Sequence, residues 1–285
     1  MEVIRIGFLG AGVMASAIIE GLVKSGRFSP DCILASDRSG ACSEKMAALG
    51  AKSTRDNVEL VKNSDVIIIG TKPDGIPTVL QDIVSKMDVE EFSTKSFISI
   101  AAGVPIASIE GYLPPNTKSV IRVMPNTPCA VNECAAAFCS GTKTDVKDKE
   151  LCSKIFSAVG TISEVPEKAM DGVTGVSGSG PAYIFMIIEA LADGGVRAGL
   201  PRAVAMQLAA QTVKGAAVMV QESGMHPGAL KDKVCSPGGT TIAAVEALEK
   251  GGLRSTIISG VMASATRSAE MRGAGGGGAA AASKK

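Results

Sequence analysis

The sequence has very few of the side chains on which triad hydrolases and histidine-based metal sites depend. It contains a single histidine, His226, and no tryptophan among its 285 residues. A triad of serine, histidine and aspartate could use only that histidine, and a metal site with several histidine ligands cannot form. The seven cysteines are odd in number and form no Cys-x-x-Cys pair, which argues against a disulfide framework and a zinc knuckle. We therefore predict no metal site.

The sequence also lacks an excess of charge and a long apolar run. Lysine and arginine number 29 against 28 aspartate and glutamate, and no block of one sign stands out. This balance argues against nucleic acid or an anionic membrane as a partner. The most apolar stretches, such as 66–70 and 182–192, carry charge or are shorter than the ~20 residues that a membrane helix needs. No signal peptide is visible at the N-terminus, so we expect a cytoplasmic protein that binds neither membrane nor nucleic acid.

What the sequence does contain is two differently patterned halves. Up to about residue 166, short β-branched runs alternate with helical stretches, and the run 66–70 is typical of a central parallel strand. This alternation predicts an α/β domain over residues 1–166, a Rossmann-type doubly wound and mostly parallel sheet. The expected strands are 3–9, 32–36, 66–70, 96–101, 119–123, 135–140 and 161–165, and the expected helices are 14–24, 43–49, 58–62, 76–86 and 145–159.

Residues 167–272 are predicted to form a second, all-α domain. Proline stands near the start of several alanine-rich segments, and Gly199 and Gly224 fall where C-terminal caps are expected. Because the apolar residues lie on more than one side of these segments, we expect a dimerisation domain whose bundle is shared between subunits. The tail, 273–285, is of low complexity and is predicted to be disordered. The expected helices are 181–198, 201–223, 229–234, 240–250 and 253–272.

A glycine-rich turn follows the first predicted strand and opens a helix. Gly10, Gly12 and Ala15 form the Gly-x-Gly-x-x-Ala version of the dinucleotide-binding fingerprint. Gly10 permits a tight turn, Gly12 lets the backbone approach a pyrophosphate, and Ala15 lets helix and strand pack closely. The free N–H groups of the helix start would bind the phosphates, whereas the alternative is a purely structural turn. The predicted cofactor contacts here are Leu9, Gly10, Ala11, Gly12, Val13 and Met14.

The end of the second strand is expected to meet the adenosine ribose of the cofactor. Asp37 could accept a hydrogen bond from a ribose 2′-hydroxyl, which favours NADH. Ser36 and Arg38 could hold a 2′-phosphate, which favours NADPH. The alternative for all three residues is an ordinary solvated position in a loop. We favour NADPH, keep NADH as the alternative, and add Asn57 to the predicted contacts.

Three later strand ends share the same edge of the predicted sheet, where cofactors bind in open α/β proteins. Lys72 could contact a ribose or a phosphate, or could simply be exposed. The small residues at 101–103 would leave room for the nicotinamide ring, and Asn126 offers an amide near that ring or caps a turn. The predicted cofactor contacts at this edge are Thr71, Lys72, Pro73, Ala101, Ala102, Gly103 and Asn126.

Three motifs resemble the signature of the pyrroline-5-carboxylate reductase family. They are Gly-Val-Thr-Gly-Val-Ser-Gly-Ser-Gly-Pro-Ala-Tyr at 172–183, Ser-Pro-Gly-Gly-Thr-Thr at 236–241 and Arg-Val-Met-Pro-Asn-Thr-Pro at 122–128. The resemblance, which runs from about residue 6 to 272, implies reduction of 1-pyrroline-5-carboxylate to L-proline, the last step of proline biosynthesis. It also implies homodimers that commonly assemble into decamers, with the substrate held between the nicotinamide and the helical domain.

The substrate of that family carries a carboxylate and a C=N bond, and the chain offers groups for both. Backbone N–H groups at Gly238, Gly239 and Thr240 would form an anion nest for the carboxylate. Thr241 is the candidate catalytic residue, because the resemblance implies that its hydroxyl faces the ring nitrogen; the alternative is a helix N-cap. Further predicted contacts, each with an ordinary structural alternative, are Ser177, Ser179 and Glu167 for the substrate, and Lys233, where the family often has Asn or Gln, for the cofactor.

Three other functions are weighed from the residues. Short-chain β-hydroxyacid dehydrogenases have a similar build but need a lysine on the first long helix after the sheet, and residues 183–198 contain none. A sensor or scaffold that binds NAD(P) without turnover would keep the glycine turn, but it would have no use for a second anion nest at 236–241. A related cyclic-imine reductase is the third alternative.

Overall fold

The computed structural model describes residues 4–37, 39–40 and 42–275 and separates into two compact units. The described residues up to 179 and from 262 onward form the first unit, and residues 180–261 form the second. The sequence placed the boundary earlier, at 166/167. Helix α7, Met170–Val173, stays with the first unit because Met170 is fully buried in its hydrophobic core.

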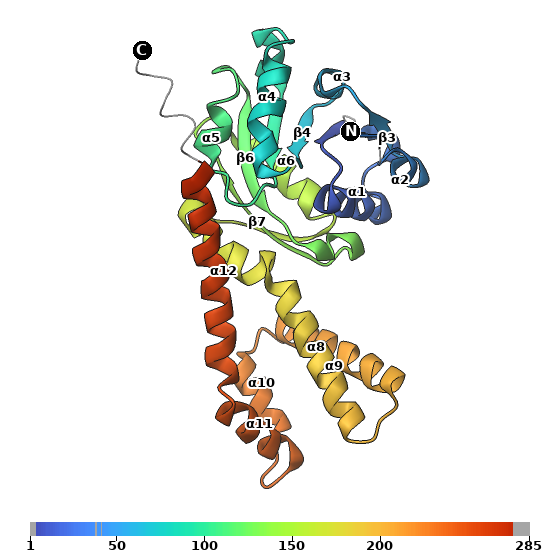
Figure 1. Cartoon of the computed structure of the whole chain (residues 1–285), viewed down its shortest axis with the longest axis vertical. Helices are drawn as coiled ribbons and strands as arrows, with labels where there is room; N and C mark the ends of the chain where they lie inside the picture. Colours follow the sequence, from blue (N-terminus) through green and yellow to red (C-terminus); the bar gives the residue numbers. More distant parts are fainter. Residues whose placement is uncertain (1–3, 38, 41, 276–285) are drawn as a thin grey trace. The chain divides into compact units, whose positions relative to one another are not determined.

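One eight-stranded sheet forms the centre of the first unit (Figure 1). Its strand order is β3-β2-β1-β4-β5-β6-β7-β8, and every neighbouring pair is parallel except β6 with β7, which confirms the predicted Rossmann-type sheet. The order reverses between β1 and β4, and in such sheets ligands bind outside the carboxyl ends of the strands at that point. The strands are β1 Ile6–Leu9, β2 Ile33–Ser36, β3 Lys52–Thr54, β4 Val66–Ile69, β5 Ser96–Ser99, β6 Ser119–Met124, β7 Cys134–Ser140 and β8 Gly160–Glu164.

Helices cover both faces of this sheet, as a doubly wound fold requires (Figure 1). Alternate residues of β4 point to opposite faces, so Val66 and Ile68 belong to one hydrophobic core and Ile67 and Ile69 to the other. Helices α1, α2 and α6 contribute to the first core, and α3, α4 and α5 to the second. Their bounds are α1 Val13–Ser25, α2 Ser43–Ala48, α3 Asn57–Lys62, α4 Ile76–Val84, α5 Ile106–Glu110 and α6 Val146–Phe156.

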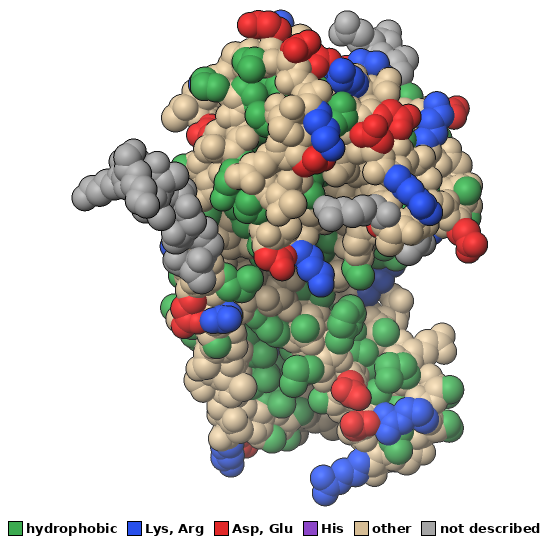
Figure 2. Space-filling model, turned by 45° about the horizontal axis from the view of Figure 1, so that its top comes forward, with side chains coloured by type: hydrophobic (Ala, Val, Ile, Leu, Met, Phe, Trp, Pro, Cys, Tyr) green, Lys and Arg blue, Asp and Glu red, His purple; other side chains and the backbone are tan. Residues whose placement is uncertain are grey.

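The second unit is all helical, as predicted. Its own core is small, because Ala192, Ala205 and Ala209 are its buried apolar residues, whereas Phe185 and Met186 are 63% and 69% exposed. On the face shown in Figure 2, apolar side chains gather over the helices of this unit. The helices are α8 Gly180–Arg197, α9 Arg202–Ser223, α10 Pro227–Val234, α11 Thr240–Lys250 and α12 Leu253–Gly275, whose residues from Met262 onward belong to the first unit.

Two helical segments, Glu167–Arg197 and Arg202–Ser223, are long and apolar enough to cross a membrane by length and composition. The sequence predicted that the most apolar stretches carry charge or are too short to cross a membrane, whereas these two helical segments reach the necessary length. Short apolar runs join into one longer segment because interspersed glycine and polar residues do not interrupt the helices. Only 11% of the most apolar part of each segment is buried against the described residues of the chain.

Asp148 is the clearest buried charge that stabilises the first unit. It is 2% exposed on α6, and its carboxylate accepts a hydrogen bond from Ser96 Oγ at 3.0 Å and pairs with Lys118 Nζ at 2.8 Å. Burial alone would raise the pKa of Asp148, but the hydrogen bonds and the charge of Lys118 hold that pKa below its ordinary value. A depressed pKa in the folded state stabilises the fold above the unfolded-state pKa and is lost as pH falls through the folded-state value.

We predict that Asp148→Asn lowers the free energy of unfolding by about 1–3 kcal/mol at neutral pH, because Lys118 loses its charged partner. In urea denaturation the difference from the wild type should begin to shrink as pH falls below about 4, where Asp148 becomes protonated in the unfolded state, and it should disappear below the depressed pKa of the folded state. Glu164→Gln is the matched control, since Glu164 pairs with Lys149 at an exposed position. It should change the unfolding free energy by less than about 1 kcal/mol, and an equal effect of both variants would contradict the interpretation.

Candidate functional site

The glycine turn between β1 and α1 is packed tightly against the sheet. Gly10 has a φ of +91°, and its N–H donates to the Ser36 carbonyl at 3.1 Å. A methyl group at Gly10 would lie 3.0 Å from Thr71 Cγ2 and 3.1 Å from Thr71 N. Ala15 is buried, and a methyl group at Gly70 would lie 3.0 Å from its Cβ. Small residues at these positions therefore let strand and helix approach closely, as predicted for Ala15.

Gly12, by contrast, faces open space. Its φ is −66°, and a methyl group on it would meet only Gly70 O, at 4.0 Å. Gly12 is the N-cap of the 13-residue helix α1, and no side chain caps that helix. Among the described residues the N–H groups of Val13 and Met14 have no hydrogen-bond partner. Free N–H groups at the positive end of a helix dipole, beside an open surface, fit a pyrophosphate.

The predicted ribose contacts at the end of β2 are largely used by the fold. Ser36 is 2% exposed, and its hydroxyl donates to Asn57 Oδ1 at 2.7 Å, so a 2′-phosphate could bind it only by breaking that bond. The Asp37 carboxylate accepts hydrogen bonds from Ser39 N, Ser39 Oγ and Cys42 N at 2.8–3.0 Å. The hydrogen bond from the Ser39 side chain is the main reason that the pKa of Asp37 lies below its ordinary value. Arg38 lies outside the described residues.

A buried hydroxyl without a partner lies at the end of β4. Thr71 Oγ1 is buried and has no hydrogen-bond partner among the described residues, and Thr71 lies directly against Gly10. An unsatisfied buried hydroxyl is costly, and a ligand at this crevice would satisfy it. Lys72 is exposed at the same strand end. These features fit a dinucleotide at the β1 and β4 ends.

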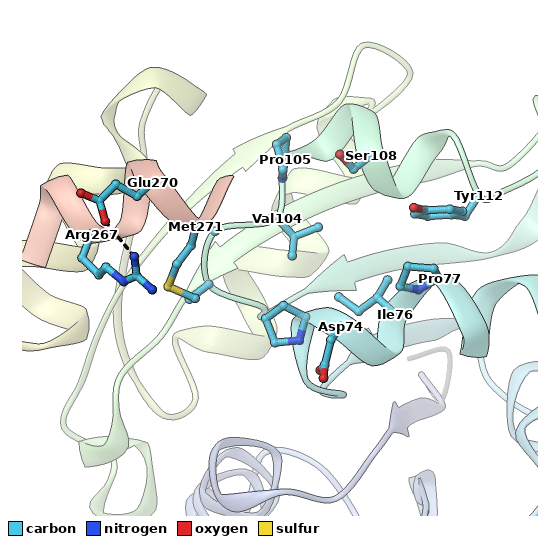
Figure 3. A pocket seen from close by; sticks show the side chains of 13 residues that line it. Asp74, Ile76, Pro77, Val104, Pro105, Ser108, Tyr112, Arg267, Glu270 and Met271 are labelled. Atoms are coloured by element: carbon cyan, nitrogen blue, oxygen red, sulfur yellow. Dashed lines mark hydrogen bonds and ion pairs between the residues drawn. The ribbon is translucent and has the colours of Figure 1, made fainter. Parts of the chain in front are cut away.

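A cavity of about 390 Å³ lies beside this edge of the sheet (Figure 3). Pro73, Ala102 and Gly103 line it, whereas Ala101 is buried beneath the strand end and no residue of the glycine turn contributes. Arg267 and Glu270 of α12 form an ion pair of 2.8 Å at the cavity (Figure 3). The remaining lining is mainly apolar: Ile76, Pro77, Val104, Pro105, Tyr112 and Met271, with Asp74 and Ser108.

Asn126 holds two segments together, because both the oxygen and the nitrogen of its amide group already have a partner. It is 4% exposed; its Oδ1 accepts from Ala135 N at 3.1 Å, and its Nδ2 donates to the Ser177 carbonyl at 3.0 Å. The side chain therefore fixes the start of β7 against the glycine-rich π-helical turn Thr174–Gly178, which the sequence predicted as a loop. The structure favours a positioning role over direct contact with the cofactor.

We predict that Asn126→Ala lowers the free energy of unfolding by about 1–3 kcal/mol, because two part-buried hydrogen bonds to the backbone are lost. Urea denaturation measures this change. Asn63→Ala is the control, since it removes one exposed hydrogen bond to Glu59 O and should cost less than about 1 kcal/mol. Equal stabilities of Asn126→Ala and the wild type would show that the bonds to Ala135 and Ser177 do not clamp the loop.

The three predicted substrate contacts before α8 also have partners within the first unit. Glu167 Oε1 accepts from the Ile106 N–H at 2.8 Å and lies 3.6 Å from a guanidinium nitrogen of Arg122. The Ser177 hydroxyl donates to Val173 O at 3.2 Å, and Ser179 Oγ and Ser264 Oγ lie 2.8 Å apart. Their side chains thus take part in packing of the loop and of α12, the alternative that the sequence left open.

The segment 236–241 in the second unit has the geometry of an anion nest. Gly238 has a φ of +66°, and a side chain on Gly239 would collide with Ser236, so neither position accepts another residue easily. Gly239 is the N-cap of α11, which leaves the N–H groups of Thr240 and Thr241 without a partner among the described residues. Thr241 is therefore the second helical residue, and the N-cap alternative for it was wrong.

The Thr241 side chain is half-buried, and its hydroxyl makes no hydrogen bond among the described residues. A free hydroxyl beside two free N–H groups can bind a substrate that has both an anionic group and a nitrogen. Lys233, predicted as a cofactor contact, donates instead to Met225 Sδ at 3.2 Å.

The sequence did not point to Arg55, which follows the unpredicted strand β3. A methyl group on Gly40 would lie 2.5 Å from Arg55 Nη2, so this guanidinium lies directly over the turn that follows β2. Recognition of β3 would have identified it, because parallel neighbours place their carboxyl ends side by side.

Both units match known proteins. The family described as pyrroline-5-carboxylate reductase dimerisation matches residues 167–271, and the one described as NADP oxidoreductase, coenzyme F420-dependent, matches residues 5–103. The pyrroline-5-carboxylate reductase of Methanosarcina acetivorans is 45% identical over 272 residues, which covers 95% of this chain and 99% of that one. The reductase of Arabidopsis thaliana is also 45% identical, covering 95% and 96% of the two chains.

The chain belongs to the pyrroline-5-carboxylate reductase family. A crystal structure of the Plasmodium falciparum reductase with NADP bound superposes with a TM-score of 0.85 at 34% identity, covering 95% of this chain and 99% of that one. The Coxiella burnetii reductase superposes with a TM-score of 0.84 at 35% identity and the same coverage. The resemblance found in the sequence motifs is therefore confirmed.

Family membership also accounts for the apolar faces of α8 and α9. Both helices lie within the region that the dimerisation family matches. Exposed Phe185 and Met186 give these helices the apolar character of obligate interfaces, which resemble a domain core cut in half. The match to the dimerisation family therefore supports the expected homo-oligomer.

Proposed function

We propose that the chain reduces 1-pyrroline-5-carboxylate to L-proline with NAD(P)H, the last step of proline biosynthesis. The observation that carries this proposal is the 45% identity to a pyrroline-5-carboxylate reductase across 95% of the chain. The geometry agrees, because the chain has one open anion cradle at Gly12 and a second at 238–241.

The residues of this chain have simple tasks in such a reaction. The reduced nicotinamide, when bound, supplies a hydride to the C=N carbon of the substrate. The N–H groups of Thr240 and Thr241 bind the carboxylate, and the Thr241 hydroxyl accepts a hydrogen bond from the N–H of the protonated ring nitrogen. That bond orients the ring for the hydride, whose addition to carbon turns the C=N π pair into the nitrogen lone pair and leaves a neutral secondary amine. Because a protonated imine already accepts a hydride, no strong acid is needed, which agrees with a single histidine that lies outside these motifs.

The finer properties of the protein are part of the same proposal. We expect NADPH as the preferred cofactor and a cytoplasmic homodimer that assembles into a decamer. We also expect no membrane and no nucleic-acid partner: apolar helices α8 and α9 are covered by a second subunit, and the chain has no excess of positive charge. Light scattering on the protein as it elutes from a size-exclusion column should give the molar mass of ten subunits. The mass of a dimer would contradict the decamer but not the proposed reaction.

Product analysis tests the reaction itself. Incubation of the enzyme with racemic 1-pyrroline-5-carboxylate and excess NADPH should yield L-proline by chiral chromatography, one molecule for each NADPH oxidised. D-proline should not form, because the reaction leaves the carboxylate-bearing stereocentre unchanged and the carboxylate nest and the Thr241 hydroxyl should accept only the L-enantiomer of the racemic substrate. NADPH oxidation without L-proline would contradict the proposed substrate.

A further inference from the structure

Backbone N–H groups of the turn after β2 bind the carboxylate of Asp37, the residue that follows this strand. The N–H of Gly40 donates to the Asp37 carbonyl at 3.0 Å, while the N–H groups of Ser39 and Cys42 each donate to the Asp37 carboxylate at 3.0 Å. In NADH-dependent Rossmann domains an acidic residue here accepts from the ribose 2′-hydroxyl. The Asp37 carboxylate instead faces the donors of the turn, so it is poorly placed to select an unphosphorylated ribose.

Arg55 lies beside the same turn from the neighbouring strand. Thr54 is the register partner of Ser36, and the Asp37 N–H donates to Thr54 O at 3.2 Å, so Arg55 follows β3 directly alongside Asp37. Three atoms of its guanidinium group lie 2.5–3.1 Å from the position that a Gly40 Cβ would occupy. A side chain at residue 40 would displace this group, and the absence of one lets the guanidinium lie on the turn.

The Arg55 guanidinium is available to a ligand. Arg55 is exposed and makes no hydrogen bond or ion pair within the part of the chain that the structure describes. It borders an open hollow of about 590 Å³, whose other side is formed by Thr78 and Val79 of α4. Five N–H donors in a planar fork match a phosphate well, and they have no acceptor here.

We propose that Arg55 binds the 2′-phosphate of NADPH and thereby sets the preference for NADPH over NADH. The adenosine ribose of a dinucleotide lies at the end of the second strand, and an arginine near that end accommodates a 2′-phosphate. This inference rests on the proposed function only in requiring an NAD(P)H cofactor.

Calorimetric titration of the full chain with 2′,5′-ADP and with 5′-AMP tests the proposal without any turnover. The wild-type protein should bind 2′,5′-ADP more tightly than 5′-AMP. Arg55→Gln should weaken 2′,5′-ADP about 10- to 100-fold, the loss expected for one charge-assisted phosphate contact, and leave 5′-AMP unchanged. The affinity of Arg55→Lys for 2′,5′-ADP should lie between those of the wild type and Arg55→Gln, because lysine keeps the charge and loses the planar fork of donors. Lys52→Gln, at the opposite end of β3, removes the same charge and should change the affinity for neither ligand.

Three results would overturn the proposal. They are equal weakening of both nucleotides by Arg55→Gln, unchanged binding of 2′,5′-ADP, and a wild type that does not discriminate between the two. If Arg55→Gln does not fold, Arg55→Lys makes the same comparison. Since neither probe is reduced, a protein inactive on the imine could still bind 2′,5′-ADP through Arg55, so this failure is distinct from failure of the proposed function.

Discussion

Replacing Gly12 by alanine is expected to weaken NADPH binding about 100-fold or more while leaving the fold intact. The backbone at Gly12 has an ordinary φ of −66°, and the new methyl group would meet no protein atom closer than 4.0 Å. It would, however, occupy the surface on which the pyrophosphate approaches the free N–H groups of α1. Loss of two charge-assisted hydrogen bonds, at about 1.5–3 kcal/mol each, gives the expected factor. Calorimetry measures the affinity, and urea denaturation measures the stability.

Two other glycines separate this effect from a general loss of stability. Gly10→Ala should lower the free energy of unfolding by about 1–3 kcal/mol, because a positive φ and the contact with Thr71 oppose a side chain. Gly75→Ala, at a φ of −86° with no atom within 4 Å of the new methyl group, should change neither stability nor affinity appreciably. NADPH affinity unchanged in Gly12→Ala would show that the cofactor does not lie over this turn.

Replacing Thr241 by valine is expected to lower kcat about 100-fold, because the isosteric side chain has no oxygen to accept a hydrogen bond from the N–H of the protonated ring nitrogen. The Thr241 hydroxyl has no partner among the described residues, so its removal should not cost a bond within the protein. Thr241→Ser keeps the hydroxyl and should retain most of the rate. Steady-state kinetics with saturating NADPH separate the effect on kcat from that on KM.

Thr256→Val is the matched control for this substitution. Thr256 is exposed in the first turn of α12 and has no proposed role in binding, so its kinetics should equal those of the wild type. A Thr241→Val enzyme with wild-type kcat would leave the backbone nest as the functional part of 236–241 and remove the hydroxyl from the mechanism.

The sequence predicts the α/β fold well because its strongest signals are local. The run 66–70 is continuous and apolar since β4 is covered on both faces, and the glycine turn is short and needs specific residues at fixed spacing. Strand β3, Lys52–Thr54, was missed because three polar residues at the sheet edge carry no apolar pattern. Helix α5 has only five residues, too few to show a helical period.

The site was less predictable, because sequence gives the type of a side chain but not its partner. Ser36 and Asn57 were both expected at the cofactor, yet they bond to each other. Asn126 was expected near the nicotinamide and instead joins β7 to the loop at 177. Arg55 could not be placed because it depends on β3, whereas the segment 236–241 was placed correctly at a helix start because glycine pairs before threonine are a local signal.

The most direct test of the account is a steady-state assay of cofactor oxidation with racemic 1-pyrroline-5-carboxylate, run in parallel with NADPH and NADH. We predict imine-dependent oxidation with both cofactors and a higher kcat/KM for NADPH. A folded protein that binds NADPH but oxidises neither cofactor in the presence of the imine would contradict the proposed reaction and would favour a nucleotide-binding protein without turnover.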